Sequence, residues 1–565
     1  MRSLLLLGFV FLPALAVAGP ACERLTDLER PDLETFAFDR APDPWAGLPA
    51  GARYRLGEIA VVRQNVFERT ENWLHRLANR YNVRTRENVI LSILPVTSGE
   101  VVSERALEEA ERILRGKVYL YDARVIPRRL CGEVLDVYLV TRDVWTLEPR
   151  LDLSRSGGEN DVGFGIGDTN VLGSGKEVAL GFEKDADRRG MNLYYRDPNI
   201  GDSRWAGEAL IVDNDDGERL AASVAYPFFS LDTRRAFAFS VDHFSREEGL
   251  YFLSEEAWEY RADTRNVRTW AGWSPGRGDS AFVNRLMLGY AYENYEFDFP
   301  AEFRTAFPGA GSPDRDYAYP FIAFERIEDD FQTRTNLDRV QLIEDIALGS
   351  RLYLELGFAG SSAPAGDHLV ARFAFSDAAW LARRQLLRFS AGLSGYYDLD
   401  DHASENLVAD LTAAYRLQHS EQWSLLVQGS AAVARNPTLD QQLLIGGDFG
   451  LRGYPNRYQT GDRRFLLTVE ERYYSNIYPL RMFRLGAAAF LDVGRAWYQG
   501  DEPDWVPSDR DGAEFDVLAN LGVGLRLEST RTRVDRIIHL DVSFPLRQGP
   551  DVRGVEVTLS AKRSL

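Results

Sequence analysis

Short runs in which apolar and polar side chains alternate recur throughout residues 146–565. In the run 352–358, leucine and phenylalanine occupy one side, and tyrosine, glutamate and glycine occupy the other. Alternation with a period of two is typical of β-strands that have one apolar face and one polar face. The same pattern occurs in the runs 236–242, 521–528, 538–544 and 555–561. Helical periodicity is almost absent here, so this region is predicted to consist of β-strands.

Two features favour a transmembrane barrel over a soluble β-sandwich, whose strands also alternate. Charged residues occur in the middle of the polar faces, and the chain contains 47 glycines, 25 tyrosines, 31 phenylalanines and 11 tryptophans. A transmembrane barrel combines an apolar outer band and aromatic girdles with a polar lumen, and only a closed barrel satisfies every strand hydrogen bond in lipid. The 420 residues of this region would form about sixteen tilted strands of roughly ten residues each. We therefore predict a mainly β fold, a sixteen-stranded antiparallel transmembrane β-barrel; a soluble sandwich is the alternative.

The first 18 residues have the pattern of a secretory signal peptide. Arg2 precedes an apolar run from Leu4 to Phe11, and the stretch ends in Ala16-Val17-Ala18, a small-x-small cleavage pattern. No later segment approaches 18 uninterrupted apolar residues, so no membrane-spanning helix is predicted. Residues 19–52 are predicted to be an N-terminal extension and a linker rich in proline and glycine.

Residues 53–145 are predicted to form a small α+β domain. A strand at 55–67 is followed by helical patterns, the last of them preceded by Ser103, and then by two alternating strands at 118–126 and 133–141. This order favours helices packed on one face of a sheet. An edge strand would then be available for a client polypeptide to add to. The alternative is a compact periplasmic domain whose edges are covered.

One segment of the barrel region, 443–455, concentrates glycines around a single arginine, Arg452. Glycine permits positive φ and close backbone approach, so the segment is predicted to be a bent loop. Alternation places Glu470 and Asp492 on the polar faces of the two strands that follow. An arginine folded back onto them would form charge-assisted bonds. The alternative is an ordinary glycine-rich turn; a phosphate-binding loop is disfavoured because no Lys-Ser/Thr pair follows.

Charge and motif content exclude several classes of function. The formal net charge of −19 argues against nucleic-acid binding, which requires a basic surface. The chain has six histidines but neither Gly-x-Ser-x-Gly nor His-Glu-x-x-His. His539 shares the predicted lumen face with Asp541 and Ser543, which indicates pore lining rather than a catalytic triad. We expect no enzyme, no catalytic residue, no metal and no cofactor.

The chain has two cysteines, Cys22 and Cys131. In an oxidising compartment they allow one disulfide, and two free thiols are the alternative.

Several motifs, in matching order, resemble one family of outer-membrane proteins. The loop Gly450-Leu451-Arg452-Gly453-Tyr454 resembles the Val/Leu-Arg-Gly-Phe/Tyr signature of the BamA/TamA-like barrels, the bacterial surface antigen family, whose relatives include two-partner secretion transporters. The segment 469–473, with Glu470, is similar to the Glu-x-Arg-aromatic strand of that family, and 490–494, with Asp492 and Gly494, to its aromatic-x-Asp-x-Gly strand. The segments 170–175 and 195–198 resemble its early barrel motifs, and 53–145 is similar to one POTRA domain.

This resemblance implies a sixteen-stranded barrel with the loop around 444–455 inside the lumen, where Arg452 contacts Asp492 and Glu470. Two departures are visible: the chain has one POTRA-like region instead of several, and the last strand ends in Lys562-Arg563-Ser564-Leu565 without a terminal aromatic residue.

The resemblance also implies a location and a function. The barrel would lie in the outer membrane of a Gram-negative bacterium, with the POTRA-like domain in the periplasm. It would assemble, insert or translocate client polypeptides, captured by the periplasmic domain through strand addition. Its partners would be outer-membrane lipid, β-rich clients and periplasmic or lipoprotein partners, with no nucleic acid. The alternative is a passive porin or a structural surface antigen without client activity.

Overall fold

The computed structural model of this chain describes residues 22–38, 45, 48–49, 51–67, 73–185, 187–278, 280–308, 313–335, 337, 343–360, 366–479, 482–500, 503–506, 516–529 and 537–562. The predicted signal peptide, residues 1–18, lies outside the described residues, as does most of 39–50 in the predicted linker. Within the described part of the chain, no helix is long and apolar enough to cross a membrane.

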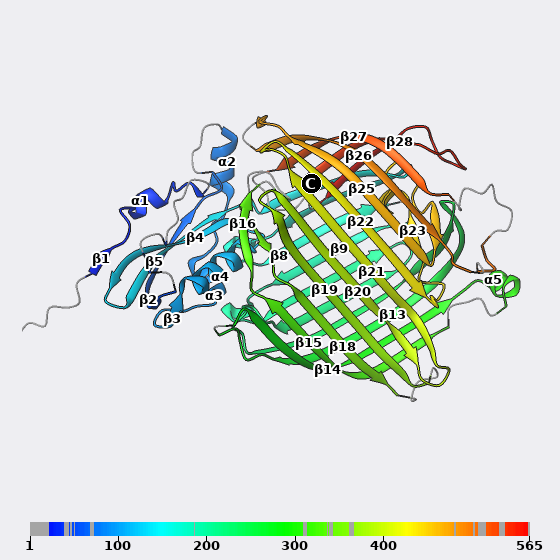
Figure 1. Cartoon of the computed structure of the whole chain (residues 1–565), viewed down its shortest axis with the longest axis horizontal. Coiled ribbons are helices and arrows are strands. Elements are labelled where there is room, and N and C mark those ends of the chain that lie inside the picture. The colour runs from blue at the N-terminus through cyan, green and yellow to red at the C-terminus, as the bar shows by residue number, and fades with distance from the viewer. Residues whose placement is uncertain are drawn as a thin grey trace, which may run out of the picture.

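The N-terminal unit is a five-stranded sheet with helices packed on it (Figure 1). The strand order is β1-β4-β5-β2-β3, with β2 parallel to β5 and the other neighbours antiparallel. Its core contains Leu56, Ile90, Leu107 and Leu135, each at most 2% exposed. The elements are β1 Cys22–Arg24, α1 Arg30–Leu33, β2 Arg53–Gln64, α2 Trp73–Tyr81, α3 Glu87–Ile93, β3 Val101–Ser103, α4 Glu104–Arg115, β4 Leu120–Cys131 and β5 Val134–Asp143.

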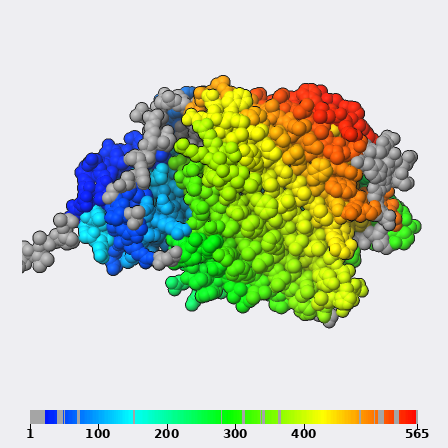
Figure 2. All heavy atoms as spheres, viewed as in Figure 1, coloured from blue at the N-terminus to red at the C-terminus, as the bar shows by residue number. Residues whose placement is uncertain are grey.

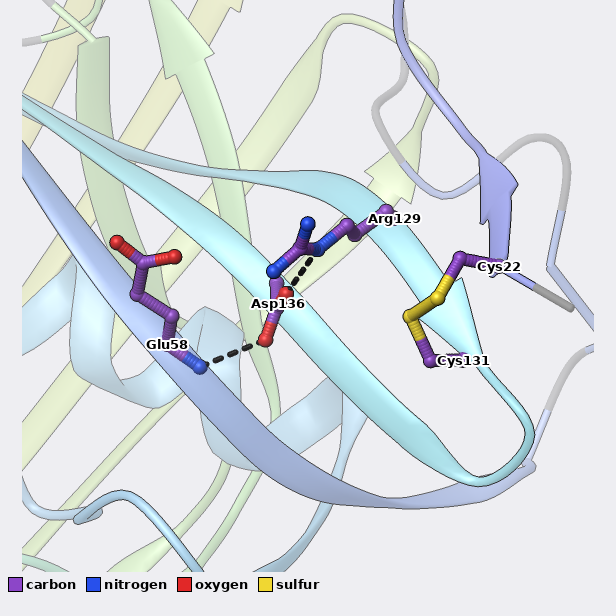
Figure 3. The surroundings of a disulfide bond; sticks show 5 residues. All are labelled: Cys22, Glu58, Arg129, Cys131 and Asp136. Carbon is purple, nitrogen blue, oxygen red and sulfur yellow. Dashed lines mark hydrogen bonds and ion pairs between the residues drawn. A yellow bond between two sulfur atoms is a disulfide. The ribbon is translucent and has the colours of Figure 1, made fainter. Parts of the chain in front are cut away.

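A disulfide holds the start of the described chain against this sheet. Cys22 of β1 and Cys131 of β4 are joined, with their Cα atoms 4.1 Å apart. Figure 3 shows the bond next to the β4–β5 turn, beside Asp136, which accepts the Glu58 N–H at 2.7 Å and pairs with Arg129. The bridge anchors β1, a strand of only three residues, at the edge of the sheet.

Among the described residues, twenty antiparallel strands close into a barrel, so the prediction of sixteen is wrong. The count failed because several connections are shorter than those assumed: Gly157-Gly158 joins β6 to β7, and Leu253-Ser254 joins β12 to β13. The strands are β6 Leu147–Ser156, β7 Glu159–Asp168, β8 Glu177–Lys184, β9 Arg189–Asp197, β10 Ala206–Asn214, β11 Glu218–Tyr226, β12 Arg235–Phe252, β13 Glu255–Trp273, β14 Phe282–Asp298, β15 Arg315–Glu328, β18 Arg351–Ala359, β19 His368–Ala382, β20 Gln385–Asp398, β21 Ala403–Gln418, β22 Trp423–Arg435, β25 Arg463–Tyr474, β26 Phe483–Trp497, β27 Leu518–Ser529, β28 Ile537–Pro545 and β29 Glu556–Lys562.

The alternation of residue types separates the two sides of the barrel wall. On β18, Leu356 is 63% exposed on the outer side, whereas its neighbour Glu355 is 1% exposed on the inner side. On β27 and β28, Leu525 is 60% exposed and Asp541 is fully buried. The wall therefore presents apolar side chains outward and encloses charged ones. Figure 2 shows one face of this wall as a closely packed surface, with the N-terminal unit against one end.

The first and last strands meet at a weak seam. Among the described residues, β29 pairs with β6 through one register pair, Leu559 opposite Arg155. The strands on either side are joined more extensively: seven register pairs connect β28 to β29, and ten connect β6 to β7. At the seam, Glu556 also accepts the Gly158 N–H at 3.0 Å and lies 3.8 Å from the Arg155 guanidinium.

The N-terminal unit docks on a series of connections at the barrel mouth, from the β7–β8 turn to the hairpin that follows β15. Near the seam, Asn170 of the β7–β8 turn donates from Nδ2 to Thr85 Oγ1 at 2.9 Å. On the other side, Arg115 of α4 pairs with Asp345 in the hairpin formed by β16 Phe331–Thr335 and β17 Ile343–Ala347, which lies between β15 and β18. The strand order places ten strands, β6 to β15, between the seam and this hairpin, and ten more on the return path. The unit therefore follows one half of the rim, from beside the seam to the opposite wall.

Candidate functional site

The segment between β22 and β25 folds back as a loop against the inner wall. Its two ends, β23 Leu443–Ile445 and β24 Gln459–Gly461, pair with each other. Positive φ angles at Gly446 (117°), Gly450 (96°) and Leu451 (64°) bend the chain between them. A Cβ on Gly450 would lie 2.3 Å from Leu466 Cδ2, so this position also requires glycine for space. The glycines thus permit the fold-back that the sequence predicts.

Apolar side chains anchor both sides of the arginine in this loop. Leu451 is fully buried and Tyr454 is 1% exposed, and they pack in one cluster with Ile445 and Leu518. The Tyr454 hydroxyl donates to the Ala519 carbonyl at 3.0 Å. Phe449, by contrast, is 38% exposed and does not anchor the loop. Arg452 is therefore fixed between two buried neighbours.

Arg452 makes a two-point contact with Asp492 of β26. Its Nε lies 2.9 Å from Asp492 Oδ2 and its Nη2 lies 3.0 Å from Oδ1. Its Nη1 donates to Glu470 Oε2 on β25 at 3.0 Å and to Asp541 Oδ2 on β28 at 3.1 Å. The planar guanidinium matches the carboxylate fork, which an ammonium group does not. One side chain thus connects three of the last five barrel strands.

Two further arginines complete the network. Arg472 donates from Nε to Glu470 Oε1 at 2.8 Å, and Arg526 of β27 pairs with Asp541. Asp492 also accepts from Thr468 Oγ1 at 2.9 Å and from Asn520 Nδ2 at 3.0 Å. The six charged members are each at most 8% exposed: Arg452, Arg472, Arg526, Glu470, Asp492 and Asp541. Three cations and three anions therefore balance inside the wall, as buried charges require.

Glycines on β27 make room for this network. A Cβ on Gly524 would lie 1.8 Å from Asp541 Oδ1, and one on Gly522 would lie 2.2 Å from the Phe490 ring. The Phe490 ring in turn packs under Arg452, whose Cζ lies 3.3 Å from the ring centroid. Such a cation–π contact is favourable when it is shielded from water. The network therefore depends on the absence of side chains at Gly522 and Gly524 as well as on its charges.

The arrangement holds a loop in place and offers no evident chemistry. Each carboxylate accepts from at least one guanidinium, and no group of potential metal ligands occurs among the described residues. Burial of paired charges with good geometry is typical of a structural lock. The network therefore fixes the loop to β25, β26, β27 and β28.

The structure brings together most of the residues selected from the sequence. Gly450, Leu451, Arg452, Gly453 and Tyr454 form the loop, and Glu470 and Asp492 are its ion-pair partners. Gly494 leaves space for the loop, since a Cβ there would lie 2.6 Å from Ile445 Cδ1. Asp541, Arg526 and Arg472 were missed as partners. The sequence did indicate the position of Asp541, because alternation placed it on the lumen face together with His539. Both side chains are buried in the structure.

Comparison with known proteins gives similarity only to solved structures. No family model and no curated protein match the sequence. BamA from Haemophilus ducreyi lacking POTRA domains 1–3 is 13% identical, with 90% of this chain and 84% of that chain covered and a TM-score of 0.39. CdiB from Acinetobacter baumannii is 12% identical (90% and 73% covered, TM-score 0.42), and CdiB from Escherichia coli is 13% identical (90% and 75% covered, TM-score 0.46). The solved structures to which this chain is similar thus include BamA, a member of the family whose motifs its sequence resembles.

Proposed function

We propose that this protein is a barrel of the Gram-negative outer membrane that inserts or translocates client polypeptides, with the seam between β29 and β6 as the place where a client strand enters. The observation that carries this proposal is that the described residues form a single register pair between the first and last strands. The apolar outer side chains support the membrane location, and the POTRA-like unit, residues 53–145, would lie in the periplasm.

The strands at the seam are joined by fewer register pairs than the neighbouring strands are. A strand hydrogen bond contributes about 0.5–1.5 kcal/mol net. In the part of the chain that the structure describes, one register pair joins β29 to β6 and ten join β6 to β7, so fewer strand hydrogen bonds oppose opening at the seam. The strand edges exposed by opening would be unsatisfied in lipid, and a client strand that pairs with them would restore the lost hydrogen bonds.

The arginine network stiffens the wall next to the seam. It connects β25, β26, β27 and β28, whereas none of its six charged members lies on β29 or β6. The loop that the network holds also reaches the other side of the seam, because the Asn456 N–H donates to the Gly157 carbonyl at 3.4 Å and Asn456 Nδ2 donates to Glu159. Opening of the seam must therefore also break these contacts. In this proposal the network is a brace for the last strands and takes no part in chemistry.

One edge of the POTRA-like sheet is better suited to capture a client than the other. On the β4 edge, α4 occupies the outward backbone groups: Glu111 accepts the Val125 N–H at 2.7 Å and Arg115 donates to the Ala123 carbonyl at 3.1 Å. At the opposite end of the sheet, β3 is an edge strand and its Val101 is 61% exposed. Client capture by strand addition is therefore assigned to the β3 edge.

A disulfide across the seam tests the proposal. In the double variant Arg155→Cys, Leu559→Cys the two thiols face each other in a register pair, and such neighbours have Cα atoms about 4.5–5.5 Å apart, within disulfide range. The matched control, Leu540→Cys with Leu559→Cys, locks β28 to β29 instead. We expect the seam lock to abolish insertion of a β-barrel client into vesicles that contain the purified protein, and we expect the control lock to leave insertion intact.

The same experiment distinguishes a barrel that inserts clients from a passive porin. Client insertion unaffected by a complete seam lock would contradict entry at the seam. Ion conductance through the reconstituted protein, without client insertion in either the locked or the unlocked state, would favour the porin.

A further inference from the structure

Helix α2 packs against its own domain through polar side chains and turns its apolar side outward. Asn79 donates from Nδ2 to the Phe67 carbonyl at 2.8 Å and accepts the Phe67 N–H at 3.0 Å. His75 is 2% exposed and stacks on the Phe67 ring, with centroids 4.0 Å apart. On the other side, Trp73, Leu77 and Tyr81 follow one another at intervals of one turn and are 63%, 42% and 64% exposed. An amphipathic surface helix ordinarily buries such a stripe, but the described part of the chain provides no apolar cover for this one.

Arginines flank this stripe. Arg76 and Arg80 are exposed, and at 3.6 residues per turn they lie along one border of the stripe. Neither makes an ion pair with a residue that the structure describes. The segment 73–86 contains four arginines and no acidic residue, although the chain as a whole has a formal net charge of −19. The outward side of α2 is therefore both apolar and locally basic.

Helix α2 lies at the end of the barrel where the N-terminal unit docks (Figure 1). The chain that leaves α2 binds the β7–β8 turn: the Arg86 N–H donates to the Gly173 carbonyl at 2.9 Å, and Arg86 Nε donates to the Leu172 carbonyl at 3.2 Å. Leu172 is itself 64% exposed, and the adjoining outward residues Ile166 and Val178 are 54% and 37% exposed. Figure 1 shows α2 next to the rim of the barrel. The helix that carries the stripe thus lies at the same end of the barrel as the exposed apolar residues Leu172, Ile166 and Val178 (Figure 1).

We infer that α2 is an interfacial helix, which inserts Trp73, Leu77 and Tyr81 into the periplasmic surface of the membrane while Arg76 and Arg80 contact anionic lipid headgroups. This inference rests on the proposed location of the barrel in the membrane. Tryptophan and tyrosine favour the boundary between lipid and water. A helix with an apolar arc beside basic residues lies in the plane of that boundary and is attracted to anionic lipids. The locally basic charge selects a lipid surface over a second copy of this acidic chain.

Spin labels on the full-length protein test the inference. Leu77→Cys carries the label on the stripe, Val101→Cys carries it on the exposed β3 edge, and Leu356→Cys carries it on the outer wall of the barrel; the Cys22–Cys131 disulfide stays oxidised. The protein is reconstituted in phosphatidylglycerol–phosphatidylcholine vesicles. Collision rates are then measured with oxygen, which concentrates in lipid, and with a water-soluble nickel chelate.

We expect the label at 77 to resemble that at 356, with high oxygen and low nickel accessibility, and the label at 101 to show the reverse. The double change Arg76→Gln, Arg80→Gln, or vesicles of phosphatidylcholine alone, should shift the label at 77 several-fold toward nickel accessibility. If the label at 77 is as accessible to nickel as the label at 101 while the label at 356 reports lipid, α2 is not an interfacial helix. This result would leave the membrane location of the barrel standing. Loss of the lipid signal at 356 overturns the membrane location itself. Protection at 77 that depends on protein concentration in detergent without lipid would identify a protein partner and also overturn it.

Discussion

Arg115 and Asp345 form a two-point ion pair that joins the N-terminal unit to the barrel across 230 positions of sequence. Arg115 Nε lies 2.8 Å from Asp345 Oδ2, and Nη2 lies 2.7 Å from Oδ1. The Arg115 side chain is 4% exposed and that of Asp345 is 17% exposed. This contact fixes α4 to the β16–β17 hairpin, on the side of the barrel opposite the seam.

Asp345→Asn should loosen this joint without unfolding either unit. Arg115 keeps its second partner, Glu111, at 3.0 Å, so we expect a loss of about 1.5–3 kcal/mol in docking, the range of a hydrogen bond to a charged group. Faster hydrogen exchange at the backbone amides of β16 and β17 would report it. The control Asp298→Asn removes a pair whose two side chains are 61% and 77% exposed and should change little. Equal exchange in both variants would refute the role of the joint.

Arg452→Ala should destabilise the loop more than any other single truncation within it. The change leaves three buried carboxylates with two arginines, at a cost of about 3–5 kcal/mol in the docked state. Arg452→Lys should restore only part of this loss because an ammonium group cannot make the two-point contact with Asp492. Thermal unfolding in detergent and protease sensitivity of the segment 446–458 measure the effect.

Arg457→Ala serves as the comparison for this prediction. Arg457 lies in the same loop and is also ion-paired, with Asp187, but that pair is on a more exposed surface, with side chains 18% and 30% exposed. A larger loss at Arg457 than at Arg452 would show that the network does not hold the loop.

Gly524→Ala tests whether the network depends on empty space. The new Cβ would meet Asp541 Oδ1 at 1.8 Å, so the carboxylate must move away from Arg526 and Arg452. Overpacking of this kind costs about 1–3 kcal/mol. Gly429→Ala is the matched control, because a Cβ on this β22 glycine meets nothing within 4 Å. Melting temperatures of the two variants should diverge, and equal values would contradict the packing argument.

The stability of the N-terminal unit should depend on pH through Asp143 of β5. Burial raises the pKa of this carboxyl to about 7, although it accepts the Thr85 N–H at 2.6 Å and the Thr85 hydroxyl at 3.1 Å. Because the pKa is higher in the fold than in the unfolded chain, the contribution of Asp143 to the free energy of unfolding is greatest below pH about 4 and falls as the pH rises to about 7. The full change is roughly 4 kcal/mol.

Asp143→Asn removes this dependence and keeps an acceptor for Thr85. Relative to the wild-type protein, the variant should therefore gain stability between pH about 4 and about 7 and stay level above that range. Hydrogen exchange of the β5 amides in the full chain measures the difference at each pH. The exposed β4–β5 turn residue changed in Glu133→Gln is the control; the same pH profile in both variants would exclude Asp143 as the source.

The local alternation of apolar and polar residues was sufficient to predict much of the fold and part of the site. Alternation identified the barrel and placed Glu470 and Asp492 on the face that Arg452 reaches, because in a strand the side-chain direction follows from position alone. It did not yield Asp541 as a partner, because that depends on which strands become neighbours and in which register. The number of strands was missed for a similar reason, since turn lengths decide it. The ion pair between Arg115 and Asp345 could not be predicted, because neither local sequence contains a pattern that indicates contact with the other.

The way the N-terminal unit is attached has a mechanical consequence. It is fixed beside the seam through Thr85 and Asn170 and to the opposite wall through Arg115 and Asp345. Between these ends it also binds the intervening turns, where Asn88 donates to Asp202 and Glu109 accepts the Leu231 N–H. The unit therefore holds the strands on one side of the seam as a single body, and force applied to it would act on that half of the ring.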